Sequence, residues 1–163
     1  MVQILVAYSS RGGNTEQMAR AVGRGVEQSG AGVTVKRASE VGKEDLVAAD
    51  GIILGSPVYF GSPTAEIAEL IDRSVGVRRK LRDKVGAAFT TAGHHTGGKE
   101  TTLLSMLCAF LIHEMVVVGD PIESGGHYGA ACLGAPGADD ERAGELLGAR
   151  VAKVAAKLKE GPS

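Results

Sequence analysis

A loop of small and hydroxyl-bearing residues joins the first apolar segment to an amphipathic segment, and its composition is typical of an anion-binding site. The loop consists of Ser10, Arg11, Gly12, Gly13, Asn14 and Thr15. The apolar run 4–8 before it predicts a buried strand, and Met18, Val22 and Val26 recur at the spacing of one helix face. Hydroxyls and unobstructed glycine N–H groups at a helix N-terminus favour a phosphate. The same hydroxyls could instead serve only as helix caps.

The elements that must position this loop alternate along the chain in the pattern of an α/β fold. The further strands are expected at 32–36, 51–55, 84–91 and 115–119, the last extended by 128–133, and the further helices at 64–72, 101–114 and 140–159. Parallel neighbours need crossover connections, which the helices supply. We therefore expect one domain over residues 1–163, an αβα sandwich around a five-stranded parallel sheet in the order 2-1-3-4-5.

Two further loops are expected beside the first, because ligands bind such sheets beyond the carboxyl ends of the strands, where the strand order reverses. The loop after the third strand contributes Pro57, Val58, Tyr59 and Phe60. The loop after the fourth strand contributes Thr91, Ala92, Gly93, His94, His95, Thr96, Gly97 and Gly98. A phosphate loop beside two aromatic residues and a glycine-rich loop describes a site for a mononucleotide with a planar ring, and FMN fits this description.

The three loops together resemble those of known FMN proteins. Segment 10–16 is similar to the phosphate loop of flavodoxins, and segments 55–61, 91–98 and 127–130 resemble flavodoxin-like NAD(P)H:quinone oxidoreductases of the tryptophan-repressor-binding-protein (WrbA) type. The resemblance implies a flavodoxin-like fold, bound FMN, NADPH or NADH as co-substrate and a quinone or similar small acceptor. It also implies that His113 lies near the flavin, although a packed helix-end histidine is an equal alternative.

Two features distinguish this chain from those quinone reductases. The chain is shorter after the third helix and after the fifth strand, and it contains no tryptophan at all, whereas the family carries one in the first of these segments. The helix expected at 101–114 is apolar around much of its circumference, which predicts either deep burial or association into a homodimer or homotetramer.

The charged residues in and beside the ring loops help to distinguish three possible roles for the bound flavin. The two ring loops contain no Asp or Glu, and Arg11 and Lys99 lie beside them, which favours reduced, anionic flavin and a two-electron oxidoreductase. The alternatives are a flavodoxin-like one-electron carrier and a flavin-dependent interaction module. A phosphoacceptor receiver domain needs carboxylates where Ser9 and Ser56 stand, and a P-loop needs a Gly-Lys-Ser/Thr ending that the first loop lacks.

Composition excludes several other classes. A net charge of −1 argues against nucleic acid, and no apolar run is long enough to span a membrane. The first strand already includes Val2, so no signal peptide is expected. Two cysteines without a C-x-x-C pair indicate a reducing cytoplasm. No metal site is expected, because the adjacent His94 and His95 cannot readily converge on one ion.

Several of the singled-out residues also have purely structural interpretations. Tyr59 and Phe60 could be core or interface aromatics, and Cys108 and Cys132 are interpreted as core thiols. The basic run 78–82 is interpreted as a solvated face, with attraction to the 2′-phosphate of NADPH as the alternative.

Overall fold

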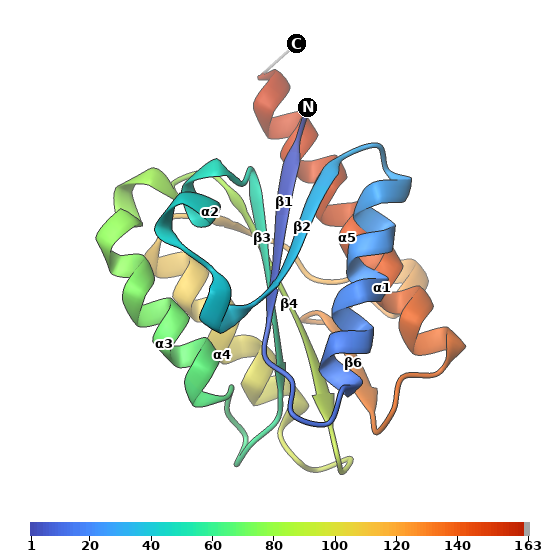
Figure 1. Cartoon of the computed structure of the whole chain (residues 1–163). Coiled ribbons are helices and arrows are strands. Elements are labelled where there is room, and N and C mark those ends of the chain that lie inside the picture. Colours follow the sequence, from blue (N-terminus) through green and yellow to red (C-terminus); the bar gives the residue numbers. More distant parts are fainter. Residues whose placement is uncertain (162–163) are drawn as a thin grey trace.

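A parallel sheet with helices on both faces forms the centre of the computed structural model, which describes residues 1–161 (Figure 1). The strands are β1 (Gln3–Tyr8), β2 (Gly32–Arg37), β3 (Gly51–Pro57), β4 (Val85–Ala92), β5 (Val116–Val117) and β6 (Ala130–Leu133). Their order is β2-β1-β3-β4-β5, all pairs are parallel, and β6 also pairs with β4. The predicted α/β fold, an αβα sandwich with strand order 2-1-3-4-5, is confirmed.

The helices form two layers, one on each face of the sheet. They are α1 (Asn14–Gln28), η1 (Ala38–Glu40), α2 (Lys43–Ala48), α3 (Ala65–Ser74), η2 (Val75–Lys80), α4 (Lys99–Ile112), η3 (Ile122–Ser124) and α5 (Ala138–Glu160). Figure 1 shows α1 and α5 on one face and α2, α3 and α4 on the other. Within residues 1–161, no helix has the length and apolar character needed to cross a membrane.

The pleat of β1 divides the core between the two faces of the sheet. Ile4 and Val6 are buried in the cluster that α1 and α5 cover, whereas Leu5 and Ala7 are buried in the cluster beneath α2, α3 and α4. This division follows because successive side chains of a strand point to opposite faces. A strand buried on both sides reads as a continuous apolar run, which is why it could be found in the sequence.

The fifth strand is divided into two short pieces. β5 pairs with the first residues of β4, at Val85 and Gly86, and β6 pairs with its last four, from Phe89 to Ala92. Between the pieces the chain leaves the sheet in a loop that the buried Asp120 holds, since its carboxylate accepts from the backbone N–H groups of Gly126 and His127 at 3.2 and 2.8 Å. The prediction that segment 128–133 extends the fifth strand is confirmed for residues 130–133.

This topology collects the loops after β1, β3, β4 and β6 at one end of the sheet, the lower end in Figure 1. Helices α1 and α4 begin at that end and run back antiparallel to the strands. The opposite end therefore carries the first residues of the strands and the last residues of α4.

Candidate functional site

A cavity of about 370 Å³ lies where the loops after β1, β3 and β4 meet. Its lining residues are Ser10, Arg11, Gly12, Asn14, Thr15, Pro57, Val58, Tyr59, Thr91, Ala92, Gly93 and Gly134. All but Gly134 belong to the three loops predicted from the sequence. Gly134 directly follows β6 and has a φ of 72°. Its place after a strand that ends at the same sheet edge was the signal that could have identified it.

The phosphate loop presents unpaired backbone donors at the start of α1. Gly13 is the N-cap residue, in the left-handed region with φ 95°, and its O accepts the first intrahelical bond from the Gln17 N–H at 3.0 Å. The N–H groups of residues 14–16 precede that bond and have no partner within the helix. No side chain caps α1, and Ser10 Oγ instead accepts from the Gly13 N–H at 3.1 Å. The interpretation of Ser10 and Thr15 as simple helix caps is therefore wrong.

Hydrogen bonds between hydroxyl groups of different segments hold the loops together. The buried Thr15 Oγ1 lies 2.8 Å from Thr91 Oγ1, which joins the phosphate loop to the end of β4. Ser9 Oγ pairs with Thr64 Oγ1 at 2.6 Å, and the Thr64 N–H donates to Ser56 Oγ at 3.0 Å. These bonds satisfy buried polar groups that would otherwise cost stability. They also explain why hydroxyl residues stand at the strand ends where a receiver domain would need carboxylates.

The loop after β3 is a tight hairpin that places one aromatic residue at the cavity and the other in solvent. Tyr59 and Ser62 exchange two backbone hydrogen bonds of 3.0 Å, while Phe60 and Gly61 turn the chain with φ values of 51° and 73°. Tyr59 lines the cavity, but Phe60 is fully exposed at the tip and is not part of the wall. The prediction that Phe60 lines the ring is not met within one chain, and neither aromatic belongs to the core.

The loop after β4 packs directly against this hairpin. Gly98 begins α4 with φ 103°, and a Cβ added to it would lie 2.6 Å from Gly61 Cα, so only glycine allows the approach. The Thr101 hydroxyl donates to the Gly61 O at 2.7 Å and joins the two loops. Between Gly93 and Gly98, the residues His94, His95, Thr96 and Gly97 stand outside the cavity wall, with the first three exposed.

His113 is the predicted site residue that the structure places farthest from this cavity. α4 begins beside the cavity but runs antiparallel to β4, so its C-terminal neighbour His113 lies at the other end of the sheet. There it is buried, and its Nε2 lies 2.7 Å from Ser74 Oγ. The expected position near the flavin is therefore not found within one chain. The alternative, a packed helix-end histidine, describes the observed position.

The two cysteines differ in their surroundings. Cys132 is buried in β6, and burial raises the pKa of its thiol to about 12, as expected for a core thiol. Cys108 is exposed, because α4 turns Met106 and Phe110 toward the sheet and Cys108 to the outside. The interpretation of Cys108 as a core thiol is wrong.

The cavity wall carries little charge. Among its lining residues within the described chain, Arg11 is the only one with a charged side chain. Its guanidinium carbon lies 4.7 Å from the centre of the Tyr59 ring, a cation–π distance. A negative charge that forms in this cavity would therefore meet a cation and no carboxylate from the wall.

The residues present fit a flavin mononucleotide. A Cβ at Gly12, Gly13 or Gly93 would meet nothing within 4 Å, so the backbone there is open to a ligand. The hydroxyls of Ser10 and Thr15 and the N-terminal N–H groups of α1 suit a phosphate. The strand ends 57–59 and 91–93 provide the mixture of apolar surface and backbone donors that suits a planar ring.

Comparisons with known proteins also indicate a protein that acts with FMN. The sequence model of the family described as NADPH-dependent FMN reductase matches residues 34–128. The chain is 38% identical to an NAD(P)H dehydrogenase (quinone) from Archaeoglobus fulgidus, over 97% of this chain and 100% of that relative. Their alignment spans 190 positions, more than the 163 residues of this chain, so the relative contains segments that this chain lacks.

Solved structures show the same architecture. The WrbA-like flavodoxin from Agrobacterium tumefaciens is 31% identical and superposes with a TM-score of 0.83, covering 96% of this chain and 98% of that one. A flavodoxin from the domain Archaea, 24% identical, superposes with a TM-score of 0.81 over 96% of this chain and 100% of its own, which shows a shared fold.

Proposed function

This chain belongs to the family of NADPH-dependent FMN reductases, and we propose that it is an FMN-dependent NAD(P)H oxidoreductase that passes two electrons to a quinone or similar small acceptor. We further propose that residues 1–163 act as one FMN-binding domain. The observation that carries the proposal is the cavity itself, in which a phosphate cradle at the start of α1 faces ring loops without a carboxylate.

Each loop has a separate task in this proposal. Ser10, Thr15 and the N–H groups of residues 14–16 bind the phosphate of FMN, with Gly12 and Gly13 leaving room for it. Residues 57–59 and 91–93 hold the ring. Residues 94–98 lie outside the cavity wall, and we assign their backbone to the polar edge of the ring on the family resemblance alone. The bonds between Thr15 and Thr91 and between Thr101 and Gly61 keep the loops at fixed separations before the cofactor binds.

The protein contributes orientation and electrostatics rather than acid–base catalysis. FMN supplies the redox chemistry by accepting a hydride from a nicotinamide and giving two electrons to the acceptor. Arg11 stabilises negative charge at the reduced ring, and within residues 1–161 its guanidinium has no carboxylate partner to weaken that effect. An acidic wall would instead oppose full reduction and separate the two electron steps, which suits a one-electron carrier.

Steady-state turnover distinguishes the oxidoreductase from the carrier. The FMN-loaded protein should oxidise NADPH or NADH rapidly when benzoquinone is present, and slowly with free FMN or without an acceptor. If no quinone-dependent turnover occurs and the one-electron-reduced flavin is stable, the protein is a carrier and the proposal is wrong. Comparison of the KM values for NADPH and NADH in the same assay identifies the preferred donor.

We also propose that the protein associates through the outer face of α4. Leu104, Leu111 and Ile112 are exposed by 39%, 60% and 63%, and Cys108 lies between them. Such an apolar strip on a helix surface is typical of an interface between subunits. Sedimentation at micromolar concentration should show at least a dimer, and a monomer would contradict this part of the proposal. The free thiol of Cys108 fits a reducing compartment, and we propose the cytoplasm.

A further inference from the structure

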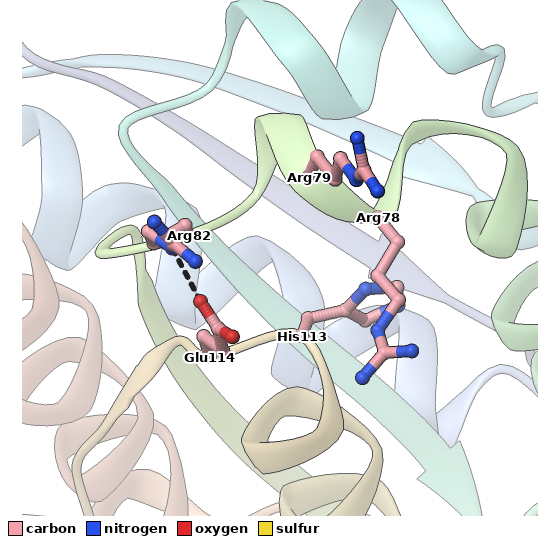
Figure 2. A pocket seen from close by; sticks show the side chains of 5 residues that line it. All are labelled: Arg78, Arg79, Arg82, His113 and Glu114. Carbon is pink, nitrogen blue, oxygen red and sulfur yellow. Dashed lines mark hydrogen bonds and ion pairs between the residues drawn. The ribbon is translucent and has the colours of Figure 1, made fainter.

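A second cavity lies at the end of the sheet opposite the phosphate cradle. It has a volume of about 570 Å³, and its lining residues are Arg78, Arg79, Arg82, His113 and Glu114 (Figure 2). We call it the arginine cleft. The first two arginines belong to η2, Arg82 precedes β4, and the remaining two residues follow α4. The eight residues of β4 separate this end of the sheet from the FMN loops by roughly 26 Å.

The arginine cleft contains two guanidinium groups without a carboxylate partner. Arg82 donates to the Glu114 carboxylate, and Figure 2 shows these two side chains turned toward each other. Arg78 uses its Nε to donate to the Ile112 O at 3.0 Å, which leaves its terminal nitrogens free for another acceptor. Neither Arg78 nor Arg79 takes part in an ion pair within residues 1–161.

The buried His113 places an unsatisfied acceptor beneath this positive surface. The Ser74 hydroxyl donates its hydrogen to the Ile71 O at 2.6 Å, so Ser74 Oγ must accept from His113 Nε2–H at 2.7 Å. This arrangement leaves Nδ1 without a hydrogen, and Nδ1 is buried without any partner. A buried acceptor left unpaired costs free energy, so the protonation state of this nitrogen is sensitive to charge nearby.

Burial, and then the positive charge of Arg78, oppose protonation of His113. Burial and the nearby Arg78 hold the pKa of His113 below its ordinary value. The groups that face it are Arg78 and Arg79 from η2, the Arg82–Glu114 pair at the rim, and the uncharged Ser74 from α3. In Figure 2 the Arg78 side chain runs beside the His113 ring. An anion that pairs with Arg78 would remove the main charge that opposes protonation of Nδ1.

We propose that the arginine cleft is a second binding site, for the phosphate monoester group of a nucleotide or small metabolite. Arg78 and Arg79 pair with the phosphate oxygens, because the planar fork of a guanidinium matches that geometry. The bound phosphate also offsets the charge of Arg78 beside the buried His113. The site is distinct from the FMN cradle, and phosphate binding itself requires no redox chemistry; only the NADPH source named below rests on the proposed function.

Two sources could supply such a phosphate group. One is the 2′-phosphate of NADPH whose nicotinamide reaches the flavin of a neighbouring subunit, since the distance along β4 separates the cleft from the flavin site of its own chain. The other is a separate phosphorylated metabolite that regulates the protein. Both present the same chemistry to the arginines, so the test contains one arm for each source.

The binding test uses FMN-loaded protein, so that the phosphate cradle is already occupied. Isothermal titration calorimetry with inorganic phosphate and with adenosine 2′-monophosphate should detect binding to the wild type. The double variant Arg78→Gln/Arg79→Gln should bind each ligand about tenfold more weakly or worse. The matched control Arg150→Gln, which removes an exposed arginine from α5, should retain the wild-type affinity. Absence of binding at millimolar ligand, or equal binding by the double variant, would overturn the proposal.

Two further measurements separate the source of the phosphate and the part of His113. If the source is NADPH, the double variant raises KM for NADPH but not for NADH; if it is a separate metabolite, the ratio of the two KM values stays constant while phosphate binding is lost. Nitrogen-15 NMR should show the His113 Nδ1 resonance moving on addition of phosphate in the wild type and not in the double variant. A stationary resonance during saturating binding would contradict the assignment of His113. Flavin absorbance of every sample shows separately whether FMN binding has failed.

Discussion

The two phosphate sites that we propose, one at each end of the sheet, differ in how they hold the phosphate. At the carboxyl ends of the strands the donors are hydroxyls and backbone N–H groups, and glycines with positive φ determine where they point. At the other end the donors are guanidinium groups on long side chains of η2. The first arrangement selects a ligand by geometry and the second by charge. Variants that change geometry should therefore damage the first site, and conditions that screen charge should damage the second.

The largest effect is expected where geometry is tightest, at Gly98. Gly98→Ala introduces a Cβ that would lie 2.6 Å from Gly61 Cα, at a φ of 103° that disfavours any side chain. The hairpin after β3 must move away from the loop after β4, and the FMN dissociation constant should rise about 100-fold. Fluorescence titration of the apoprotein with FMN measures this change.

The control for that variant is Gly137→Ala, at the start of α5, where the nearest atom to a new Cβ is a carboxylate oxygen of Asp140 at 3.7 Å. It should leave FMN affinity unchanged. Phosphate binding in the arginine cleft should be the same in both glycine variants. Equal FMN affinity in Gly98→Ala and wild type would show that the contact between the two loops is not needed.

A smaller loss of FMN affinity is expected from removal of one hydroxyl in the cradle. Thr15→Val keeps the shape of the side chain but removes the bond to Thr91 Oγ1 and a donor to the phosphate. The dissociation constant for FMN should rise by about tenfold or more. Thr34→Val, at an exposed position of β2, is the matched control and should have no effect. An unchanged affinity in Thr15→Val would remove this hydroxyl from the phosphate site.

Added salt should weaken phosphate binding in the arginine cleft a few-fold, while FMN binding changes less. Raising NaCl from about 0.05 M to 0.5 M shortens the screening length to a few ångströms, which weakens attraction between exposed charges. Phosphate affinity of the arginine cleft should fall by about threefold or more, and FMN affinity should change by less than about twofold. Calorimetry at both salt concentrations provides the values. An equal response of the two sites would contradict the division into geometric and electrostatic recognition.

The smallest expected effect is a pH dependence of stability due to His113. Its pKa in the folded state is lowered by burial and by Arg78, so the unfolded chain binds the proton more readily. This contribution to the free energy of unfolding is complete above the unfolded pKa of about 6.5 and is lost as the pH falls toward the folded value. His113→Gln should flatten the slope of stability against pH near pH 6 by at most about 1.4 kcal/mol per pH unit. Urea unfolding of the wild type and the variant at several pH values measures this slope.

The control for the pH experiment is His95→Gln, which replaces an exposed histidine. It should retain the wild-type slope. Added phosphate should reduce the wild-type slope, because pairing of Arg78 with the anion raises the pKa of His113. A wild-type slope that survives in His113→Gln would show that other groups cause it.

The convergence of the three loops on one cavity could be predicted from the sequence, whereas the arginine cleft could not. Glycines, hydroxyls and apolar runs lie next to one another in the chain at the cradle, so Ser10–Thr15 could be recognised as a strand-to-helix loop. The arginine cleft combines η2 with the end of α4, more than thirty residues apart, and only the fold brings Arg78 beside His113. The basic run 78–82 by itself indicates a solvated face, with attraction to the 2′-phosphate of NADPH as the alternative.

Three residues lie elsewhere within one chain than the sequence suggested, and the cause is the direction in which each residue points. The sequence placed Phe60 in the right loop, but the left-handed turn at Phe60 and Gly61 rotates that ring away from the cavity. His113 was assigned to the right helix, but helix direction sends it to the far end of the sheet. Cys108 lay within an apolar run, but its position on the helix faces outward. Packing between segments that are distant in the sequence determines the orientation of all three residues.

The most direct test of the central claim, that the uncharged ring loops and Arg11 support two-electron chemistry, is anaerobic reductive titration of the FMN-loaded protein followed by absorbance. The titration should pass from oxidised to fully reduced flavin with little one-electron-reduced form, and Arg11→Gln should accumulate more of it than Arg11→Lys. Accumulation of a large one-electron-reduced fraction in the wild type, unchanged in Arg11→Gln, would contradict the claim.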